Sequence, residues 1–475
     1  MSTAAKKFNP FLILNWAIVL FMCFVFPNLS PLGALSENGM ALVGCFLGAV
    51  WGWSTISMEG PSFIALFCMG WYLGFDTIAG AAFGNVTVIS LMFMFILLGC
   101  ISETGAVNWL VTKLFSFKFF VGKPWVTIAF FFYVSFFLAG FNSVIMAVVL
   151  ITIIKSVCET LKLEPFSKLP TLFVIGNLYS LLMGQVVFPF HGVPFIMVST
   201  YSAMYQTPID FVKYIMLALP LGLVMVLVFT LAMRFIFRVD ASPFKNFDAS
   251  IFGENKAMTK DQKKAFAIFF IFIFCLLASC TTALGPVYQF LNKIGVMGIA
   301  FLFMFVVLFM KAENGKPFIH LSAPTPWGIV LITATVMIIS QFMMSPDYGI
   351  TATIGMMIKP LLVLSDYMLV VVILAIAVLI THVATNMIVS IVMMPFVVTA
   401  AMQIGIEPTA LVVLLFFTCQ MSIATPGGGA PISAMFYGIS DWVKVSTTSK
   451  YAALMVPILL VCDIIIGLAW ANIIF

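Results

Sequence analysis

Charged residues are scarce in this chain of 475 residues. They make up 8% of it, against 63% hydrophobic residues, and the mean hydropathy is +1.18. Soluble domains carry about 25% charged residues, so this composition excludes a soluble globular protein. Each membrane crossing takes roughly 20 apolar residues, and the length allows about ten or more crossings. The composition predicts an all-α integral membrane protein in contact with lipid.

The sequence also lacks the motifs of redox, metal and catalytic sites. Its nine cysteines are scattered, mostly inside apolar segments, with no CxxC pair, so we expect neither a disulfide framework nor a bound cofactor. It has no HExxH motif, and no Asp pair or Ser/Lys pair is placed for catalysis. A membrane-embedded enzyme is therefore the weaker hypothesis. The lysines lie in separate loops and not on one basic face, so nucleic acid is not an expected partner.

Two stretches of the chain repeat each other at a fixed separation of 237 residues (426 − 189 = 237). Three prolines, a glycine and a Lys-Tyr pair recur in one register, which is far less expected by chance than matches of Leu or Val. A duplicated unit of this kind is typical of secondary transporters. The matched pairs are Leu178/Leu415, Pro189/Pro426, Gly192/Gly429, Pro194/Pro431, Lys213/Lys450, Tyr214/Tyr451, Leu217/Leu454, Pro220/Pro457, Leu223/Leu460 and Val224/Val461.

Apolar runs bounded by charges, glycines or prolines predict the membrane helices. An amphipathic stretch from Trp109 to Lys123 is expected to lie along the membrane interface. Eleven crossings and two re-entrant hairpins result. The expected crossings are 11–28, 39–56, 61–75, 85–102, 170–203 (broken near Pro189), 211–236, 264–283, 293–310, 326–343, 408–438 (broken near Pro426) and 449–473.

The two hairpins are predicted from apolar runs that are interrupted halfway. Residues 125–154 carry no charge, and 139–143 (Ala-Gly-Phe-Asn-Ser) divide them. A single helix of this length would be about 45 Å long, too long for a hydrocarbon core of about 30 Å. The equivalent run lies between Asp366 and Glu407 and turns near 381–386.

Lysine and arginine placement predicts the topology, because cytoplasmic loops carry the excess of positive residues. Basic residues cluster in the loop 239–263 and its borders, so this loop and the N-terminus are expected in the cytoplasm, with the protein in the plasma (inner) membrane.

The two repeats are five crossings apart. Because this number is odd, the second repeat is inverted relative to the first. We expect an N-terminal helix at 1–38, a first repeat at 39–236 (scaffold 39–117, transport 124–236), the loop at 237–263, and a second repeat at 264–475 (scaffold 264–343, transport 366–475).

The candidate substrate site is at the hairpin tips. Asn142, Ser143, Thr385 and Asn386 stand where a second half-helix begins. These residue types cap helices, and the first helical turn leaves N–H groups directed at an anion. The same residues could instead serve only as interhelical hydrogen-bonding groups.

The broken helices supply the rest of the candidate site. Proline frees upstream carbonyl groups, and glycine lets a ligand approach the backbone closely. A flexible kink is the alternative for the glycine run. We predict substrate contacts from His191, Thr425, Pro426 and Gly427, and Na⁺ contacts from Asn142, Gly184, Asn386 and Ala424.

Histidine supports an alternative coupling mechanism. We find no Lys, Arg, Asp or Glu at the expected mid-depth of the membrane, so His191 and His382 are the titratable side chains there. An intramembrane ionisable group is a functional hypothesis, and an H⁺ symporter or an anion exchanger that uses these histidines stays open. Each could also be neutral and structural. A cation/proton antiporter would need a buried Asp or Glu, and none is expected.

These motifs resemble the divalent anion/sodium symporter family of the ion transporter superfamily. In that family each hairpin tip carries Ser-Asn-Thr and each broken helix a Thr-Pro-Pro-Asn-like turn. Here the tips read Phe141-Asn142-Ser143 and Thr385-Asn386-Met387, and the turns Phe188-Pro189-Phe190-His191 and Thr425-Pro426-Gly427-Gly428. The resemblance implies a homodimeric elevator-type transporter of a small di- or tricarboxylate or similar divalent anion. It implies Na⁺ as the coupling ion and no other cofactor.

Overall fold

The computed structural model describes residues 10–115, 122–141, 143–190, 192–205, 209–247, 257–321, 325–343, 345–425 and 428–475. Within these ranges the protein is helical, and the β pairing is one isolated bridge between Lys311 and Pro317. The predicted all-α class is confirmed.

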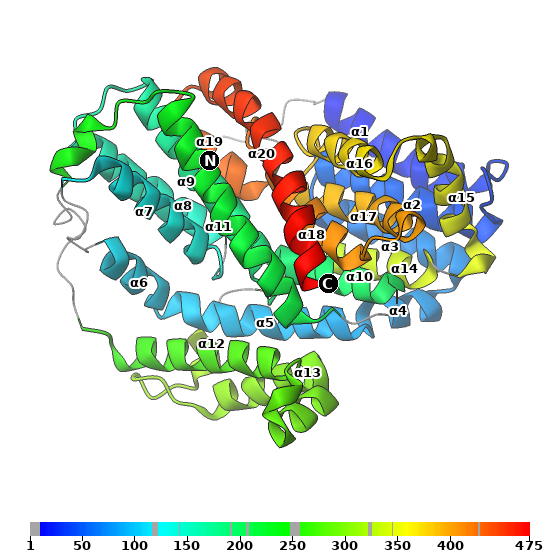
Figure 1. Cartoon of the computed structure of the whole chain (residues 1–475). Coiled ribbons are helices and arrows are strands. Elements are labelled where there is room, and N and C mark those ends of the chain that lie inside the picture. The colour runs from blue at the N-terminus through cyan, green and yellow to red at the C-terminus, as the bar shows by residue number, and fades with distance from the viewer. Residues whose placement is uncertain are drawn as a thin grey trace, which may run out of the picture. The chain divides into compact units, whose positions relative to one another are not determined.

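The chain divides into two compact units. Figure 1 labels helices of both units. Unit 1 takes its described residues from 1–92, 199–207 and 326–363, and unit 2 takes the others. Unit 1 holds α1 (Pro10–Leu20), α2 (Glu37–Thr55), α3 (Glu59–Leu73), α4 (Phe75–Phe83), α14 (Trp327–Met343) and α15 (Ile350–Ile358). Unit 2 holds α6 (Ala106–Phe115), α7 (Pro124–Leu138), α8 (Ser143–Thr160), α9 (Lys168–Val187), α11 (Phe211–Phe235), α12 (Lys260–Ala278), α13 (Pro286–Phe309), α16 (Asp366–Ile380), α17 (Asn386–Ile404), α18 (Pro408–Gln420), α19 (Ala430–Gly438) and α20 (Val445–Ile474). Residues of α5 (Val86–Glu103) and α10 (Gly192–Tyr205) belong to both units.

Seven helical segments of the described residues are long and apolar enough to cross a membrane, which makes this a multi-pass membrane protein. All seven coincide with predicted crossings or hairpin arms. The short helices α4 and α15, of nine residues each, were not expected. Their apolar runs are too short to be distinguished in the sequence from the apolar residues that flank a loop. The spans are Pro10–Asn28, Val86–Glu103, Lys168–Tyr205, Phe211–Phe235, Pro286–Phe309, Asn386–Ile404 and Val445–Ile474.

Local sequence explains where several helices begin and end. The Asp210 carboxylate accepts hydrogen bonds from the backbone N–H groups of Val212 and Lys213, at 2.8 and 3.2 Å, and so caps α11. Thr259 and Gln262 form a capping box at the start of α12. Gly405 adopts a φ of +75° and ends α17, a conformation in which glycine avoids the strain of a side chain.

The internal repeat is visible as a repeated order of helices in unit 2. A hairpin (α7, α8), a broken pair (α9, α10) and a long helix containing Pro220 (α11) make up the first copy. Another hairpin (α16, α17), a broken pair (α18, α19) and a long helix containing Pro457 (α20) make up the second. The helices α7 and α16 have 15 residues each, about 22 Å at 1.5 Å per residue. Both are too short to span a bilayer, as a re-entrant hairpin requires.

The matching helices α11 and α20 pack against each other in opposite directions. The Trp470 indole donates a hydrogen bond to the Met216 carbonyl at 2.8 Å. At the other ends of these two helices, the rings of Phe237 and Tyr451 lie 5.5 Å apart. The start of α11 therefore meets the end of α20, and this antiparallel pairing is what an inverted repeat predicts.

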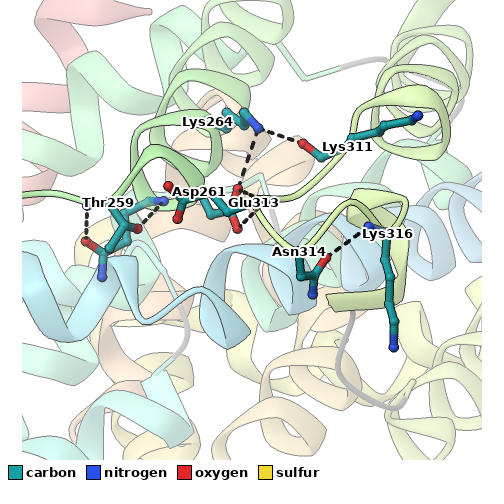
Figure 2. Close-up of polar contacts among 8 residues, drawn as sticks. Thr259, Asp261, Lys264, Lys311, Glu313, Asn314 and Lys316 are labelled. Atoms are coloured by element: carbon teal, nitrogen blue, oxygen red, sulfur yellow. Dashed lines mark hydrogen bonds and ion pairs between the residues drawn. The ribbon is translucent and has the colours of Figure 1, made fainter.

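Two basic segments, one at the start of α12 and one after the end of α13, contact each other, as Figure 2 shows. The Lys264 ammonium donates to the Lys311 carbonyl at 2.6 Å and lies 3.6 Å from the Asp261 carboxylate. That carboxylate also accepts from the Glu313 backbone N–H at 3.0 Å. The lysines of both segments therefore lie close together, at the start of α12 and after the end of α13.

Candidate functional site

The second hairpin tip is a turn between α16 and α17. The helix α16 ends at Ile380, and α17 begins at Asn386 with Thr385 in the N-cap position. Thr385 makes no side-chain cap hydrogen bond. The Asn386 side-chain oxygen instead accepts from the Met387 N–H at 2.8 Å. The predicted start of a half-helix at Thr385 and Asn386 is correct.

Asn386 is buried and joins the tip to the broken helix. Its amide nitrogen donates to the side-chain oxygen of Gln420, the last residue of α18. A Cβ atom added at Gly429 would lie 3.2 Å from the Asn386 side-chain oxygen. Glycine therefore lets the backbone at the start of α19 come close to Asn386, and the first turns of α17 and α19 meet at this point.

Other hydrogen bonds connect the same two segments. The Thr381 hydroxyl donates to the Cys419 carbonyl at 2.9 Å, and the Thr425 hydroxyl donates to the His382 carbonyl. The hairpin tip and the break after α18 therefore form one hydrogen-bonded unit.

The first hairpin reaches this region through α8, which packs beside α19. A Cβ atom at Gly438 would lie 2.7 Å from the Ile151 side chain, and the Lys155 ammonium lies 2.9 Å from the Asp441 carboxylate. Residue numbers rise together along the two helices, so they run in the same direction. Ser143 and Ala430, the first residues of α8 and α19, each lie eight residues before the contact between Ile151 and Gly438, about 12 Å at 1.5 Å per residue. The N-terminal ends of α8 and α19 are therefore level with each other.

The first tip packs closely against its own broken helix. A Cβ atom at Gly184 would lie 1.8 Å from the Phe136 carbonyl oxygen, so only glycine allows α9 to approach α7 this closely. Gly140 lies against the Phe188 ring, and the Phe141 ring stacks on Phe269 at 4.9 Å. An apolar cavity of about 340 Å³ adjoins this tip.

The structure describes some of the predicted site residues and not others. Asn142, His191, Pro426 and Gly427 lie outside the described residues. Ser143 is buried at the first residue of α8, and Gly184 lies in the last turn of α9. Ala424 is buried beside Thr425 in the break between α18 and α19. Carbonyl groups in a last helical turn have no partner further along the helix, so Gly184 is placed to offer an oxygen.

His382 has one ring nitrogen engaged and one without a partner. Its Nδ1 lies 2.6 Å from the Val378 carbonyl. A carbonyl can only accept, so this nitrogen carries the hydrogen. The other nitrogen, Nε2, is buried and has no hydrogen-bond partner.

The expectation that no acidic side chain lies at mid-depth was wrong. Asp463 is fully buried in α20. It lies about 27 Å from the start of this helix and about 16 Å from its end, at 1.5 Å per residue. The sequence carries the signal, because Asp463 stands inside the apolar run 449–473. Gln420 was also missed, since a glutamine at a helix end has no distinguishing pattern until its partner is known.

The arrangement suits an anion. Each helix N-terminus carries roughly half a positive charge on its free N–H groups, and such ends bind carboxylates and phosphates. The starts of α17 and α19 meet at Asn386, and the start of α8 is level with that of α19.

Residues 46–418 match the model of the citrate transporter family. This range covers most of the chain, from α2 to the last turn of α18. The chain belongs to the citrate transporter family. This family is part of the group of ion transporters to which the divalent anion/sodium symporters belong, so the resemblance seen in the motifs is confirmed. A search of the curated proteins found no match. This citrate transporter family member is a membrane transporter, and α19 and α20 lie beyond the matched range.

Proposed function

We propose that this protein is a secondary active transporter that carries a small di- or tricarboxylate, with citrate as the first candidate, in symport with Na⁺. The observation that carries the proposal is the meeting of half-helix N-termini from α17 and α19 at Asn386, level with the start of α8. The described residues of α17 and α19 include no lysine or arginine, and the Lys155 ammonium of α8 is paired with the Asp441 carboxylate at 2.9 Å. Helix ends and side-chain amides would therefore meet the charge of the substrate, together with co-transported cations.

The repeat supports an alternating-access mechanism. Two inverted copies of one fold can adopt inward-facing and outward-facing states of similar energy, and the matching helices α11 and α20 are antiparallel. We propose an elevator-type movement of the hairpins within a homodimer in the plasma (inner) membrane. The N-terminus would be cytoplasmic, on the count of basic residues. A thiol reagent that cannot cross membranes should then fail to label Lys316→Cys on intact cells.

The decisive experiment measures uptake into proteoliposomes. Radiolabelled citrate, succinate, tartrate and sulfate are supplied to the purified protein, each with an inward Na⁺ gradient and with choline in its place. We expect citrate uptake that depends on Na⁺. Equal uptake with choline would contradict Na⁺ coupling, and no uptake of any carboxylate would contradict the function.

Substitution of the tip asparagines tests the site. Asn386→Ala leaves the buried Gln420 oxygen without its partner, a cost of about 1–3 kcal/mol. Citrate affinity should fall roughly five- to more than a hundred-fold. Asn142→Ala is predicted to act in the same direction. His320→Ala is the control, because His320 is exposed beside Lys316 on the α13–α14 connection. Unchanged affinity in both asparagine variants would exclude the paired-tip site.

A further inference from the structure

The apolar cavity beside the first hairpin tip runs from the surface into the interior of the protein. Phe137 and Phe270 line it and are 48% and 60% exposed. Leu138 and Phe190 also line it but are only 1% and 2% exposed. The first pair therefore forms the mouth of the cavity, and the second pair belongs to its floor.

Water is a poor occupant of this cavity. A buried water molecule needs about two to four polar partners, and the side chains that line the cavity are those of Leu, Ile and Phe, apart from one glycine. An empty cavity lowers stability by an amount that grows with its volume, which here is about 340 Å³. An apolar occupant is therefore favoured.

The mouth of the cavity opens on an apolar surface. Phe274, about one turn beyond Phe270 on α12, is also exposed. Exposed apolar side chains that adjoin one another in this way mark a surface that contacts membrane, and this is a multi-pass membrane protein. A lipid acyl chain can enter the mouth directly from the bilayer, without passing through water.

The helix α6 places a positive charge beside the cavity. It begins against α12, where the Gln262 side chain donates to the Thr104 carbonyl at 3.3 Å. Further along α6, Leu110 and Leu114 line the cavity, and Lys113 is exposed between them. Residues three and four apart share one side of a helix. Within the described ranges, neither of the two ion pairs involves Lys113, so its ammonium is available to the phosphate of a phospholipid.

The floor of the cavity includes the first hairpin tip. Leu138 is the last residue of α7, and Phe141, which also lines the cavity, lies in the turn that follows. In the same turn, Gly140 lies against the Phe188 ring of the broken helix. An acyl chain in the cavity would therefore touch the tip and restrict its movement.

We propose that this cavity binds one acyl chain of a membrane phospholipid, that the phosphate of this lipid lies at Lys113, and that the bound lipid stabilises the first hairpin tip. The site uses none of the groups that meet at Asn386. Its occupation does not depend on which substrate the protein carries, or on whether transport is coupled to Na⁺.

The first test is photo-crosslinking in a bilayer. The purified protein is placed in nanodiscs that contain a phospholipid with a diazirine at the end of one acyl chain, and the labelled residues are identified by mass spectrometry. We expect labels at Leu138, Phe141 and Phe190, which are buried from lipid on the outer surface. Phe67 of α3 is exposed and should report ordinary surface lipid. Labels at Phe67 without labels at the floor would overturn the proposal.

Leu219→Trp fills the cavity from α11 and should lower labelling of the floor several-fold, with labelling of Phe67 unchanged. Leu227→Trp is the matched control, because Leu227 is exposed on the same helix and does not line the cavity. Equal labelling of the floor in these two variants would contradict the site. Leu110→Phe applies the same test from α6, so the result does not depend on the folding of one variant.

The second test addresses the phosphate. Phosphatidylglycerol added to the delipidated protein in detergent should raise its thermal midpoint, and diacylglycerol with the same chains should bind more weakly. Lys113→Gln should weaken the apparent affinity for phosphatidylglycerol roughly five-fold, while Lys113→Arg retains it. Lys316→Gln, at an exposed lysine on the α13–α14 connection, is the control. Equal affinity for the two lipids, or unchanged affinity in Lys113→Gln, would overturn the place of the phosphate.

The third measurement is amide hydrogen exchange at residues 137–141. Bound phosphatidylglycerol should slow exchange there several-fold in the unaltered protein. Leu219→Trp should show slow exchange with or without the lipid, because the new side chain occupies the cavity. An exchange rate that lipid does not change in the unaltered protein would contradict stabilisation of the tip.

Discussion

The first and second hairpin regions share one order of helices but differ in how the hairpin meets the broken helix. In the first, α7 lies on the backbone of α9 at Gly176 and Gly184. The equivalent positions in the second, 237 residues later, are Val413 and Met421. The second hairpin is held instead by hydrogen bonds from Asn386, Thr381 and Thr425. The repeat therefore fixes the path of the backbone, while each copy has its own means of holding its tip.

The largest effect that would test this comparison is expected from Gly184→Val. The new side chain would meet the Phe136 carbonyl, a backbone atom that cannot rotate away. Overpacking usually costs about 1–3 kcal/mol and occasionally more, and we expect the upper end here. The thermal midpoint of the purified protein should fall sharply. Gly80→Ala is the control, because open space surrounds a Cβ atom at Gly80, and an equal loss in both variants would refute the close packing.

The next effect concerns the polar contact of the second region. Gln420→Leu leaves the Asn386 amide without an acceptor, at about 1–3 kcal/mol. Citrate affinity should fall roughly five- to a hundred-fold. Gln185→Leu in the first region is the matched variant, because the Gln185 side-chain oxygen is buried without a partner. If Gln185→Leu lowers affinity more than Gln420→Leu, the substrate contacts are centred on the first tip.

Thr381→Val should have a smaller effect. It removes the hydroxyl that donates to the Cys419 carbonyl, a contact of about 1 kcal/mol. Amide hydrogen exchange at the tip, between α16 and α17, should become several-fold faster. Thr55→Val, which removes an exposed intrahelical hydrogen bond, serves as the control. An unchanged exchange rate at the tip would show that the hydroxyl does not hold it.

The smallest effect is expected where the two copies meet. Trp470→Phe removes the indole N–H that donates to the Met216 carbonyl near the ends of α11 and α20. The contact is exposed, so we expect a loss of about 0.5 kcal/mol and a small fall in the thermal midpoint. Trp327→Phe, at an exposed position on α14, should change it less. A fall as large as that of Gly184→Val would mean that the pairing of α11 and α20 depends mainly on this bond.

Hydrophobic runs were sufficient to locate most helices because each run must match a membrane thickness or stop at a break. The breaks after Val187 and after Gln420, and the hairpin turns after Leu138 and Ile380, lie where the sequence predicts them. Short helices such as α4 and α15 were not predicted, because nine residues are too few to show a clear helical periodicity of hydrophobic residues. Asn386 was identified from its place at a tip, but its partner Gln420 was not, because a contact across 34 positions leaves no local pattern.

The sequence by itself determined that this is an all-helical membrane protein with a duplicated unit, because apolar content, proline and glycine act on the nearest turns of the chain. Only the tertiary structure decided which polar groups meet. It brought the starts of α17 and α19 together at Asn386, and it enclosed Asp463 of α20 beside Thr418 of α18. Burial and hydrogen bonding between distant helices depend on how the helices pack, and no single segment carries that information.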